Sequence, residues 1–135
     1  MKFSRQTAIV GIGATEFSKN SGRTPMQLAT ECSLKACEDA GIEPSLINGI
    51  SVFSAEKNTE IEVARNLGIP ELTFFSMIHH GGGAPGGVIQ QAAMAVDSGV
   101  ADYVLVYRAF NERSWHRFGT GVQGRHQSPE AFDVS

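Results

Sequence analysis

Short apolar runs alternate with helical runs along most of this 135-residue chain, and this alternation constrains the fold more than any other feature. Strands that alternate with helices usually pair in parallel, with helices packed over the sheet. The sequence therefore predicts an α/β fold, a layered βαβαβαβ unit with a parallel or mixed sheet. The predicted strands are 6–10, 47–53, 72–78 and 103–107, and the predicted helices are 24–40, 59–67 and 88–98.

Local signals mark the helix boundaries. Thr24 and Gln27 have the spacing of a capping box, and Pro25 between them suits the first helical position. Gly41 is placed to end this helix. The sequence also predicts that Asn58 caps the second helix.

The apolar pattern ends near residue 110. A chain of this length has room for one core, so we assign residues 1–110 to a single α/β domain. Residues 111–135 are polar and aromatic without a periodic apolar face, and they predict an irregular excursion that needs a partner surface.

Composition excludes some classes of function. The net charge of −3 argues against nucleic-acid binding, which usually requires a dense basic face. No apolar stretch is long enough to span a membrane, and no leader-like segment precedes Ala8. We therefore expect a cytoplasmic protein without a membrane span.

Two patterns resemble binding motifs but favour simpler interpretations. Cys32 and Cys37 lie five residues apart in a helical run, which suits neither a disulfide nor a CxxC metal site. Gly11 and Gly13 open a glycine pattern like that of dinucleotide-binding folds, but Glu16 replaces the third glycine and would repel a pyrophosphate. We expect small packed cysteines, a strand-to-loop turn and no metal site.

A glycine-rich segment at 81–87 follows the third predicted strand and precedes the third helix. Glycine tolerates the sharp turn that exposes a nucleophile in other α/β enzymes, but no Ser, Cys, Thr or Lys occupies this one. The segment is explained equally by close packing of helix and sheet. Alternatively, the amides of Gly82, Gly83 and Ala84 offer hydrogen bonds to an anion or a carbonyl oxygen.

Three polar groups flank this turn or lie at a neighbouring strand end. His79 and His80 precede the turn, and in extended chain they point to opposite faces, so one of them is expected to face the site as an acid or base. Arg108 follows an apolar strand on the side where open α/β sheets bind ligands.

The chain resembles the N-terminal part of thiolases, and within that superfamily the thiolase-like lipid-transfer proteins that include aldolases of steroid side-chain degradation. Six segments carry the resemblance: 9–15, 17–23, 58–61, 71–76, 81–84 and 107–114. The resemblance implies a thiolase-like layered fold, and it implies that this chain corresponds to the N-terminal part of a longer protein.

The same resemblance implies the reaction. Gly82 falls where thiolases carry the nucleophilic cysteine, as expected for aldolases that cleave a β-hydroxyacyl-CoA to a steroid ketone and propionyl-CoA without an acyl-enzyme. Together with the residues around the turn and the strand end, this predicts His80, Gly82 and Gly83 as catalytic positions and His79, Gly81, Ala84, Arg108 and Asn111 as substrate-binding positions.

The resemblance further implies a homodimer, a separate partner with an OB-fold domain of the DUF35 type, and no cofactor beyond the coenzyme A of the substrate. Tyrosines in the second half of such proteins are the implied acid–base groups. Two other functions remain open from the residues alone. One is an acetyl-CoA acetyltransferase-type acyltransferase, which the missing nucleophile disfavours, and the other is a non-catalytic acyl-CoA- or lipid-binding module.

Overall fold

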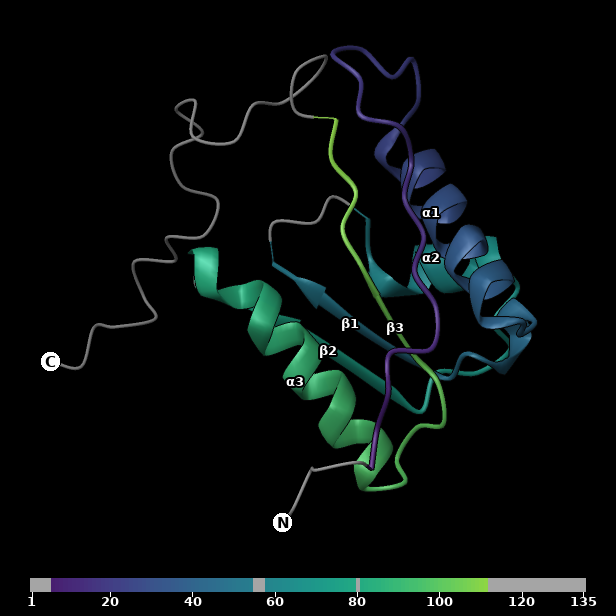
Figure 1. The fold of residues 1–135 in the computed structure, drawn as a ribbon, viewed down its shortest axis with the longest axis vertical. Coiled ribbons are helices and arrows are strands. Elements are labelled where there is room, and N and C mark those ends of the chain that lie inside the picture. The colour runs from purple at the N-terminus through teal and green to yellow at the C-terminus, as the bar shows by residue number, and fades with distance from the viewer. Residues whose placement is uncertain (1–5, 55–57, 80, 112–135) are drawn as a thin grey trace, which may run out of the picture.

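The computed structural model describes residues 6–54, 58–79 and 81–111 (Figure 1). Most of the predicted elements are present, with shifted ends, and the third helix begins earlier than predicted, at Ala84. The elements in chain order are α1 (Pro25–Ala40), a 3-10 turn (Pro44–Leu46), β1 (Gly49–Phe53), α2 (Glu60–Leu67), β2 (Phe74–Ile78), a 3-10 turn (Gly81–Gly83), α3 (Ala84–Asp97) and β3 (Val104–Tyr107).

The three strands form one parallel sheet in the order β2-β1-β3. The central strand β1 pairs Phe53 with Ile78 of β2, and it pairs Val52 with Tyr107 of β3. All three strands therefore end at the same edge of the sheet. This edge is where ligands bind in open α/β folds.

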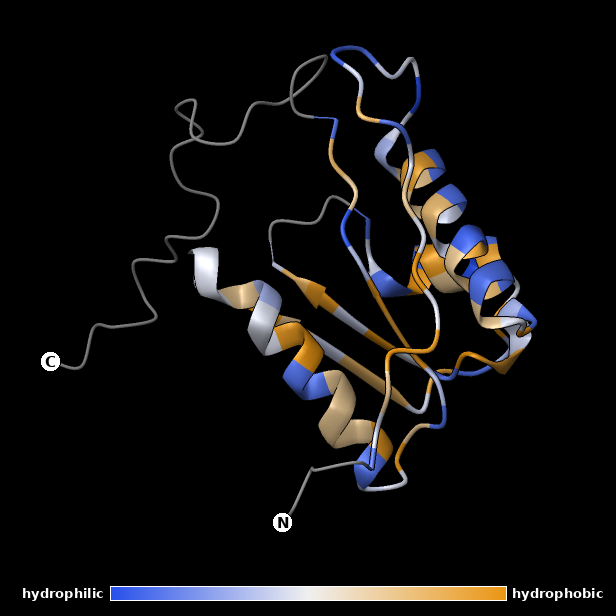
Figure 2. Ribbon diagram, viewed as in Figure 1, coloured by the Kyte–Doolittle hydropathy of each residue, from blue (hydrophilic) through white to orange (hydrophobic). Residues whose placement is uncertain are grey.

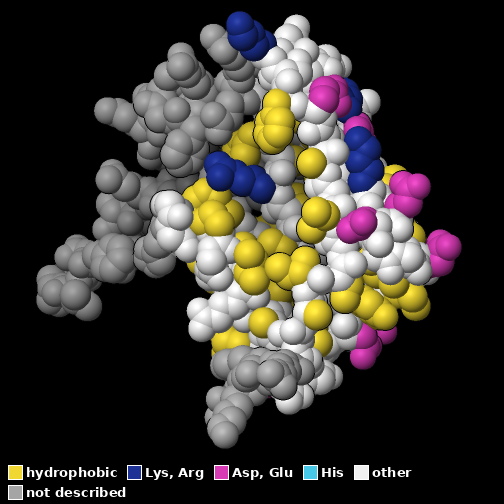
Figure 3. Space-filling view, in the orientation of Figure 1, with side chains coloured by type: hydrophobic (Ala, Val, Ile, Leu, Met, Phe, Trp, Pro, Cys, Tyr) yellow, Lys and Arg dark blue, Asp and Glu magenta, His cyan; other side chains and the backbone are white. Residues whose placement is uncertain are grey.

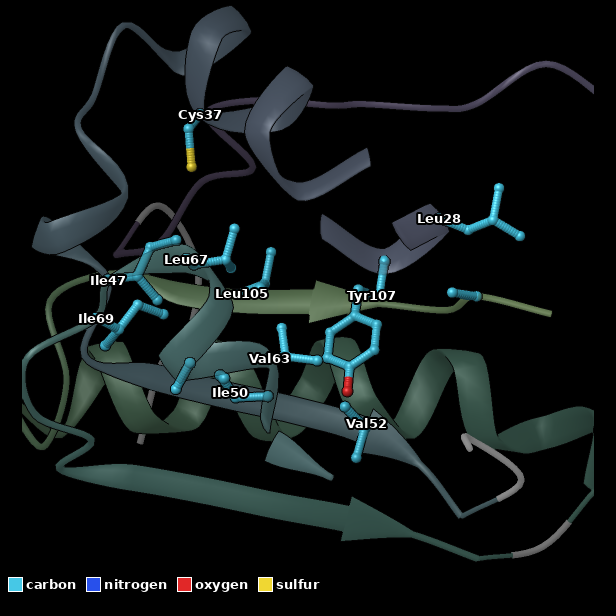
Figure 4. Packing of buried hydrophobic residues seen from close by; sticks show 13 residues of the cluster. Leu28, Cys37, Ile47, Ile50, Val52, Val63, Leu67, Ile69, Leu105 and Tyr107 are labelled. Atoms are coloured by element: carbon cyan, nitrogen blue, oxygen red, sulfur yellow. The ribbon is translucent and has the colours of Figure 1, made fainter. Parts of the chain in front are cut away.

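Helices cover both faces of the sheet. Figure 1 shows α1 and α2 on one side and α3 on the other. Most of the buried apolar side chains lie on the α1 and α2 side, where β1 contributes Ile50 and Val52 and α2 contributes Val63 (Figure 4). The opposite face packs on α3, because a Cβ added at Gly87 of α3 would lie 3.2 Å from the Ile78 side chain.

The N-terminal segment corrects one prediction. Residues 6–10 were expected to form a strand, but they are extended chain that pairs with no strand in the described part of the structure. The segment that follows lies against α1 instead, with Gly11 close to Ala36 and Gly13 close to Cys32. The Ile12 amide donates a hydrogen bond to Asp39 at 2.8 Å.

Several large apolar side chains of the described residues are exposed, and two segments carry many of the most exposed ones. On the outer strand β2, Phe75 is 64% exposed and Met77 is 46% exposed. Along the N-terminal segment the exposed side chains are Ile9, Val10, Ile12 and Phe17. Figure 2 shows how hydrophobic and hydrophilic residues are distributed along the elements, and Figure 3 shows hydrophobic side chains across the middle of one face.

The helix boundaries follow the capping signals with one correction. Thr24 and Gln27 make both hydrogen bonds of a capping box at the start of α1. The cap of α2 is Thr59 rather than Asn58, because Thr59 and Glu62 form the same reciprocal pair. No helix among the described residues is long and apolar enough to cross a membrane.

Cys32 and Cys37 form no disulfide bond. Cys37 is buried in the core, and burial, followed by the nearby Glu43 carboxylate, raises the pKa of its thiol.

Candidate functional site

The elbow, which we define as residues 81–84, joins the end of β2 to the start of α3. Its first three residues form a 3-10 turn, and Ala84 begins α3 and is buried. Gly82 and Gly83 are exposed, and a Cβ added to either would meet no atom of the described residues within 4 Å. The backbone at Gly82 therefore has open space on the side where a side chain would project.

The start of α3 differs from the starts of the other helices. A capping box closes the N-terminus of both α1 and α2, whereas no side chain caps α3 among the described residues. The first amides of a helix have no partner within the helix, and they carry partial positive charge. The 3-10 turn runs directly into α3, and because such a turn pairs each carbonyl with the amide three residues on, it engages the amide of Ala84. Of the predicted donors, Gly82 stands before these bonds, and Pro85 occupies an early helical position as expected.

Of the two histidines, the structure describes only one. His79 directly follows β2 and its side chain is exposed. His80, the predicted acid or base, lies outside the described residues, so its role stays a prediction. Among the described residues, no group of three or more His, Cys, Asp or Glu side chains is arranged to hold a metal ion.

Arg108 immediately follows β3, at the same edge of the sheet as the elbow. Its guanidinium carbon lies 5.7 Å from the centre of the Phe53 ring and 4.5 Å from the centre of the Phe110 ring. Sequence reasoning singled out Arg108 but neither aromatic residue. The only available signal was that Phe53, like Arg108, lies at the end of an apolar strand run.

Asn111 contacts the loop before α1, which is a different part of the chain from the elbow. Its side-chain amide donates to the backbone oxygen of Arg23 at 2.6 Å and accepts from the Ser21 hydroxyl at 3.3 Å. These bonds connect the chain after β3 to the loop before α1. A substrate-binding role for Asn111 remains a prediction, and the described contacts assign it a part in positioning this loop.

The loop before α1 also carries a charge cluster. Arg23 pairs with Glu16 and Glu31, and Lys35 pairs with Glu31 at 2.8 Å. The hydrogen bond from Arg23 is the main cause that lowers the pKa of Glu16 to about 2, and Glu16 in turn raises the pKa of Arg23. Glu16 is therefore neutralised by a neighbour within the chain, which gives it a structural role.

A hollow of about 1100 Å³ lies beside the sheet and does not include the elbow. Its walls are the extended N-terminal segment, α1, the later turns of α3 and the edge strand β3. Arg108 and Phe110 belong to its lining. We place the candidate site at the elbow, because the hollow is open, is lined mainly by apolar groups and contains none of the predicted donors at 81–84.

No protein-family model matches the chain. It is 60% identical over 118 residues to a steroid side-chain-cleaving aldolase of Thermomonospora curvata. It is 61% identical over 116 residues to the 17-hydroxy-3-oxo-4-pregnene-20-carboxyl-CoA lyase of Mycobacterium tuberculosis. These matches cover 87% and 86% of this chain but only 30% of each relative. The chain thus spans about a third of the length of these relatives.

Solved structures agree with this similarity. The Ltp2-ChsH2(DUF35) aldolase matches with a TM-score of 0.77 and 62% identity, over 79% of this chain and 28% of that one. A monomeric SCP2-thiolase-like protein type 1 from Mycobacterium smegmatis matches with a TM-score of 0.60 and 25% identity, over 73% of this chain and 22% of that one. The predicted thiolase-like α/β fold is therefore confirmed for the described residues.

Proposed function

We propose that this chain, which belongs to the thiolase superfamily and within it to the branch of steroid side-chain-cleaving aldolases, is part of a carbon–carbon lyase. The whole protein would cleave a β-hydroxyacyl-CoA steroid side chain to a steroid ketone and propionyl-CoA. The observation that carries the proposal is an elbow with an open glycine, Gly82, in a chain 60% identical to such an aldolase.

The reaction needs no nucleophile on the protein. A base removes the proton from the tertiary hydroxyl, and the bond between the carbinol carbon and the carbon next to the thioester breaks. The electron pair of that bond becomes the thioester enolate, and a proton delivered to the enolate carbon completes propionyl-CoA. The cleavage involves no net oxidation or reduction and consumes no free thiol, so coenzyme A takes part only as the thioester of the substrate.

The elbow would stabilise the charge that forms during cleavage. The amide of Gly82 stands at the start of the 3-10 turn that leads into α3, and a donor fixed in this way lowers the energy of an oxyanion more than water does. An open glycine leaves room for the thioester where a cysteine side chain would stand. His80 and groups in the rest of the protein are the proposed acids and bases.

Two partners belong to this proposal. An OB-fold protein of the DUF35 type is supported by the Ltp2-ChsH2(DUF35) aldolase, which is 62% identical over the matched region. A homodimer is supported by the outer strand β2, whose Phe75 and Met77 side chains are exposed. Sedimentation of the full-length protein should give a dimer that Phe75→Lys weakens. The proposed acyl-CoA substrate accords with the expected cytoplasmic location.

The reaction class is tested with the full-length protein and its DUF35-type partner. A steroid side-chain CoA thioester with a tertiary 17-hydroxyl is supplied, and propionyl-CoA is followed by mass spectrometry. Release without added free CoA supports retro-aldol cleavage, because thiolysis consumes a CoA. Acyl-CoA that binds without release would favour the binding-module alternative, and release only with free CoA would favour the acyltransferase.

The position of the site is tested by filling the open space at Gly82. Gly82→Leu should abolish cleavage and leave the melting temperature unchanged, because a Cβ at this position meets no atom of the described residues and the longer side chain blocks the elbow. Gln90→Leu, on the exposed surface of α3 away from the elbow, is the matched control and should keep full activity. Unchanged turnover in Gly82→Leu would remove the elbow from the mechanism.

A further inference from the structure

The Arg108 side chain lies on the α3 face of the sheet. Side chains alternate between faces along a strand, and Leu105, Tyr107 and Ala109 all belong to the core on the α1 and α2 side. Arg108 and Phe110 therefore project to the opposite face. Phe53 projects to the same face, because it lies next to the core residue Val52.

Two aromatic rings restrain the guanidinium. Its carbon lies over the rings of Phe53 and Phe110, within the distance at which a cation is attracted to an aromatic face. Phe53 is 8% exposed, so its ring is fixed by packing. Because contact with a ring uses the flat face of a guanidinium, the N–H donors in its plane remain available to a ligand.

The charge of Arg108 is not neutralised by the described part of the chain. No carboxylate among the described residues forms an ion pair with Arg108, whereas Arg23 pairs with both Glu16 and Glu31. An exposed arginine without a partner usually samples several rotamers. Arg108 instead combines a fixed orientation with an unused positive charge, which is the state of a group that receives an anion.

The register of the sheet places Arg108 close to the elbow. Phe53 pairs with Ile78, and Val52 pairs with Tyr107, so Arg108 is level with the last residue of β2. Two strand spacings, about 10 Å, separate their strands. The elbow begins three residues after Ile78 on the same face, where α3 packs. One acyl-CoA can therefore contact the elbow amides and Arg108 together.

We propose that Phe53 and Phe110 position the Arg108 guanidinium to bind an anionic oxygen of the acyl-CoA held at the elbow, and that Phe110 is the positioning residue that can be varied without disturbing the core. This inference rests on the proposed function. The anionic oxygen belongs either to the thioester enolate or to a phosphate of coenzyme A, and kinetic constants distinguish the two.

The test uses the full-length protein with its DUF35-type partner and compares Phe110→Leu, Phe110→Tyr, Arg108→Gln and Arg108→Lys. Phe110→Leu should reduce kcat/KM by about two- to fivefold, the size of an exposed cation–π contact. Phe110→Tyr keeps an aromatic face and should match the wild type. Arg108→Gln should lose more than Phe110→Leu, and Arg108→Lys should not recover the loss, since an ammonium lacks the flat face.

Separate constants identify the oxygen. A rise in KM together with weaker inhibition by free CoA assigns a phosphate, and a fall in kcat with unchanged CoA inhibition assigns the enolate. Leu46→Ala removes an exposed apolar side chain from the turn before β1, at the opposite edge of the sheet from Arg108, and is the matched control. Circular dichroism confirms that each variant is folded.

Variants of Phe110 and Arg108 that behave like Leu46→Ala in kcat, KM and CoA inhibition would overturn the inference while leaving the lyase activity established. A wild-type protein that releases no propionyl-CoA would instead refute the proposed function. In that case the affinity for CoA, measured by calorimetry for wild type and Arg108→Gln, decides the inference. A weaker variant supports it, and equal affinities refute it.

Discussion

Gly13→Ala should detach the N-terminal segment from α1. The added Cβ would lie 2.2 Å from the carbonyl oxygen of Cys32 and 2.5 Å from the amide nitrogen of Ala36, and Cβ atoms essentially never approach other atoms this closely. Both contacts are helix backbone, which cannot rotate away as a side chain can. The segment must therefore move outward by about 1 Å to reach ordinary contact distances.

The cost follows from that displacement. Overpacking of this kind destabilises proteins by about 1–3 kcal/mol. The hydrogen bonds from Ile12 to Asp39 and from Lys35 to Ala14, at 2.8 and 3.2 Å, would also weaken, although both are exposed and add little. A destabilisation of about 2 kcal/mol lowers Tm by roughly 4–8 °C in a protein of 150–250 residues. The fall in Tm is smaller in a longer protein, because its entropy of unfolding is larger.

The measurement is thermal unfolding of the full-length protein, combined with hydrogen exchange at the amides of residues 7–18. The matched control is Gly82→Ala, where the added Cβ meets no atom of the described residues within 4 Å and the backbone requires no positive φ. The control should leave Tm and exchange unchanged. If Gly13→Ala behaves like this control, the close packing of the segment on α1 is refuted.

Two further changes test other contacts. Ser51 and Ser76 share a 2.7 Å hydrogen bond between β1 and β2, so Ser51→Ala should lower the free energy of unfolding by about 1 kcal/mol. The double change to alanine should cost less than the sum of the single changes, since each single change leaves one hydroxyl without its partner. Additive costs in urea unfolding would contradict this coupling. The pKa of Glu16 is lowered from 4.5 to about 2, so its contribution to stability is complete above pH 4.5 and is lost as the pH falls through 2. The small difference in Tm between wild type and Glu16→Gln should therefore shrink between pH 5 and pH 2, and a difference independent of pH would contradict the ion pair.

Local chemistry made most of the elements predictable. The capping box of Thr24 and Gln27, the glycine stop at Gly41 and the apolar runs of the three strands act over a few residues, and each is found where the sequence placed it. The elbow was predictable for the same reason, because glycines between a strand and a helix carry their own conformational signal.

Long-range pairing explains the error at residues 6–10. Ile9 and Val10 favour extended backbone, but a strand also needs a neighbour, and sequence pattern does not supply one. The structure instead explains two observations that were separate in the sequence. Gly11 and Gly13 allow the chain to contact the backbone of α1, and the small residues of that helix, such as Ala36, make the approach possible.

In the candidate site, too, local signals were predictable from the sequence and long-range contacts were not. Arg108 was predictable as a charge at a strand end, but Phe53 is more than fifty positions away in sequence, and only the register of the sheet brings them together. The substrate-binding role of Asn111 stays a prediction, and its contact with the loop before α1 was not foreseen from the sequence. Side-chain destinations of this kind depend on tertiary packing, which no local pattern encodes.

The direction of α3 connects the fold to the proposed chemistry. The elbow end of this helix carries the positive end of its dipole and faces the edge of the sheet that carries Arg108. Acidic groups lie at the opposite end, with Asp97 as the last residue of α3 and Asp102 just before β3. The first turn of α2, at the same edge of the sheet, carries Glu60 and Glu62, so the dipole of α3 rather than the net charge of that edge would stabilise an enolate at the elbow. A reaction that generates negative charge on the substrate suits this arrangement, even though no nucleophilic side chain occupies the turn.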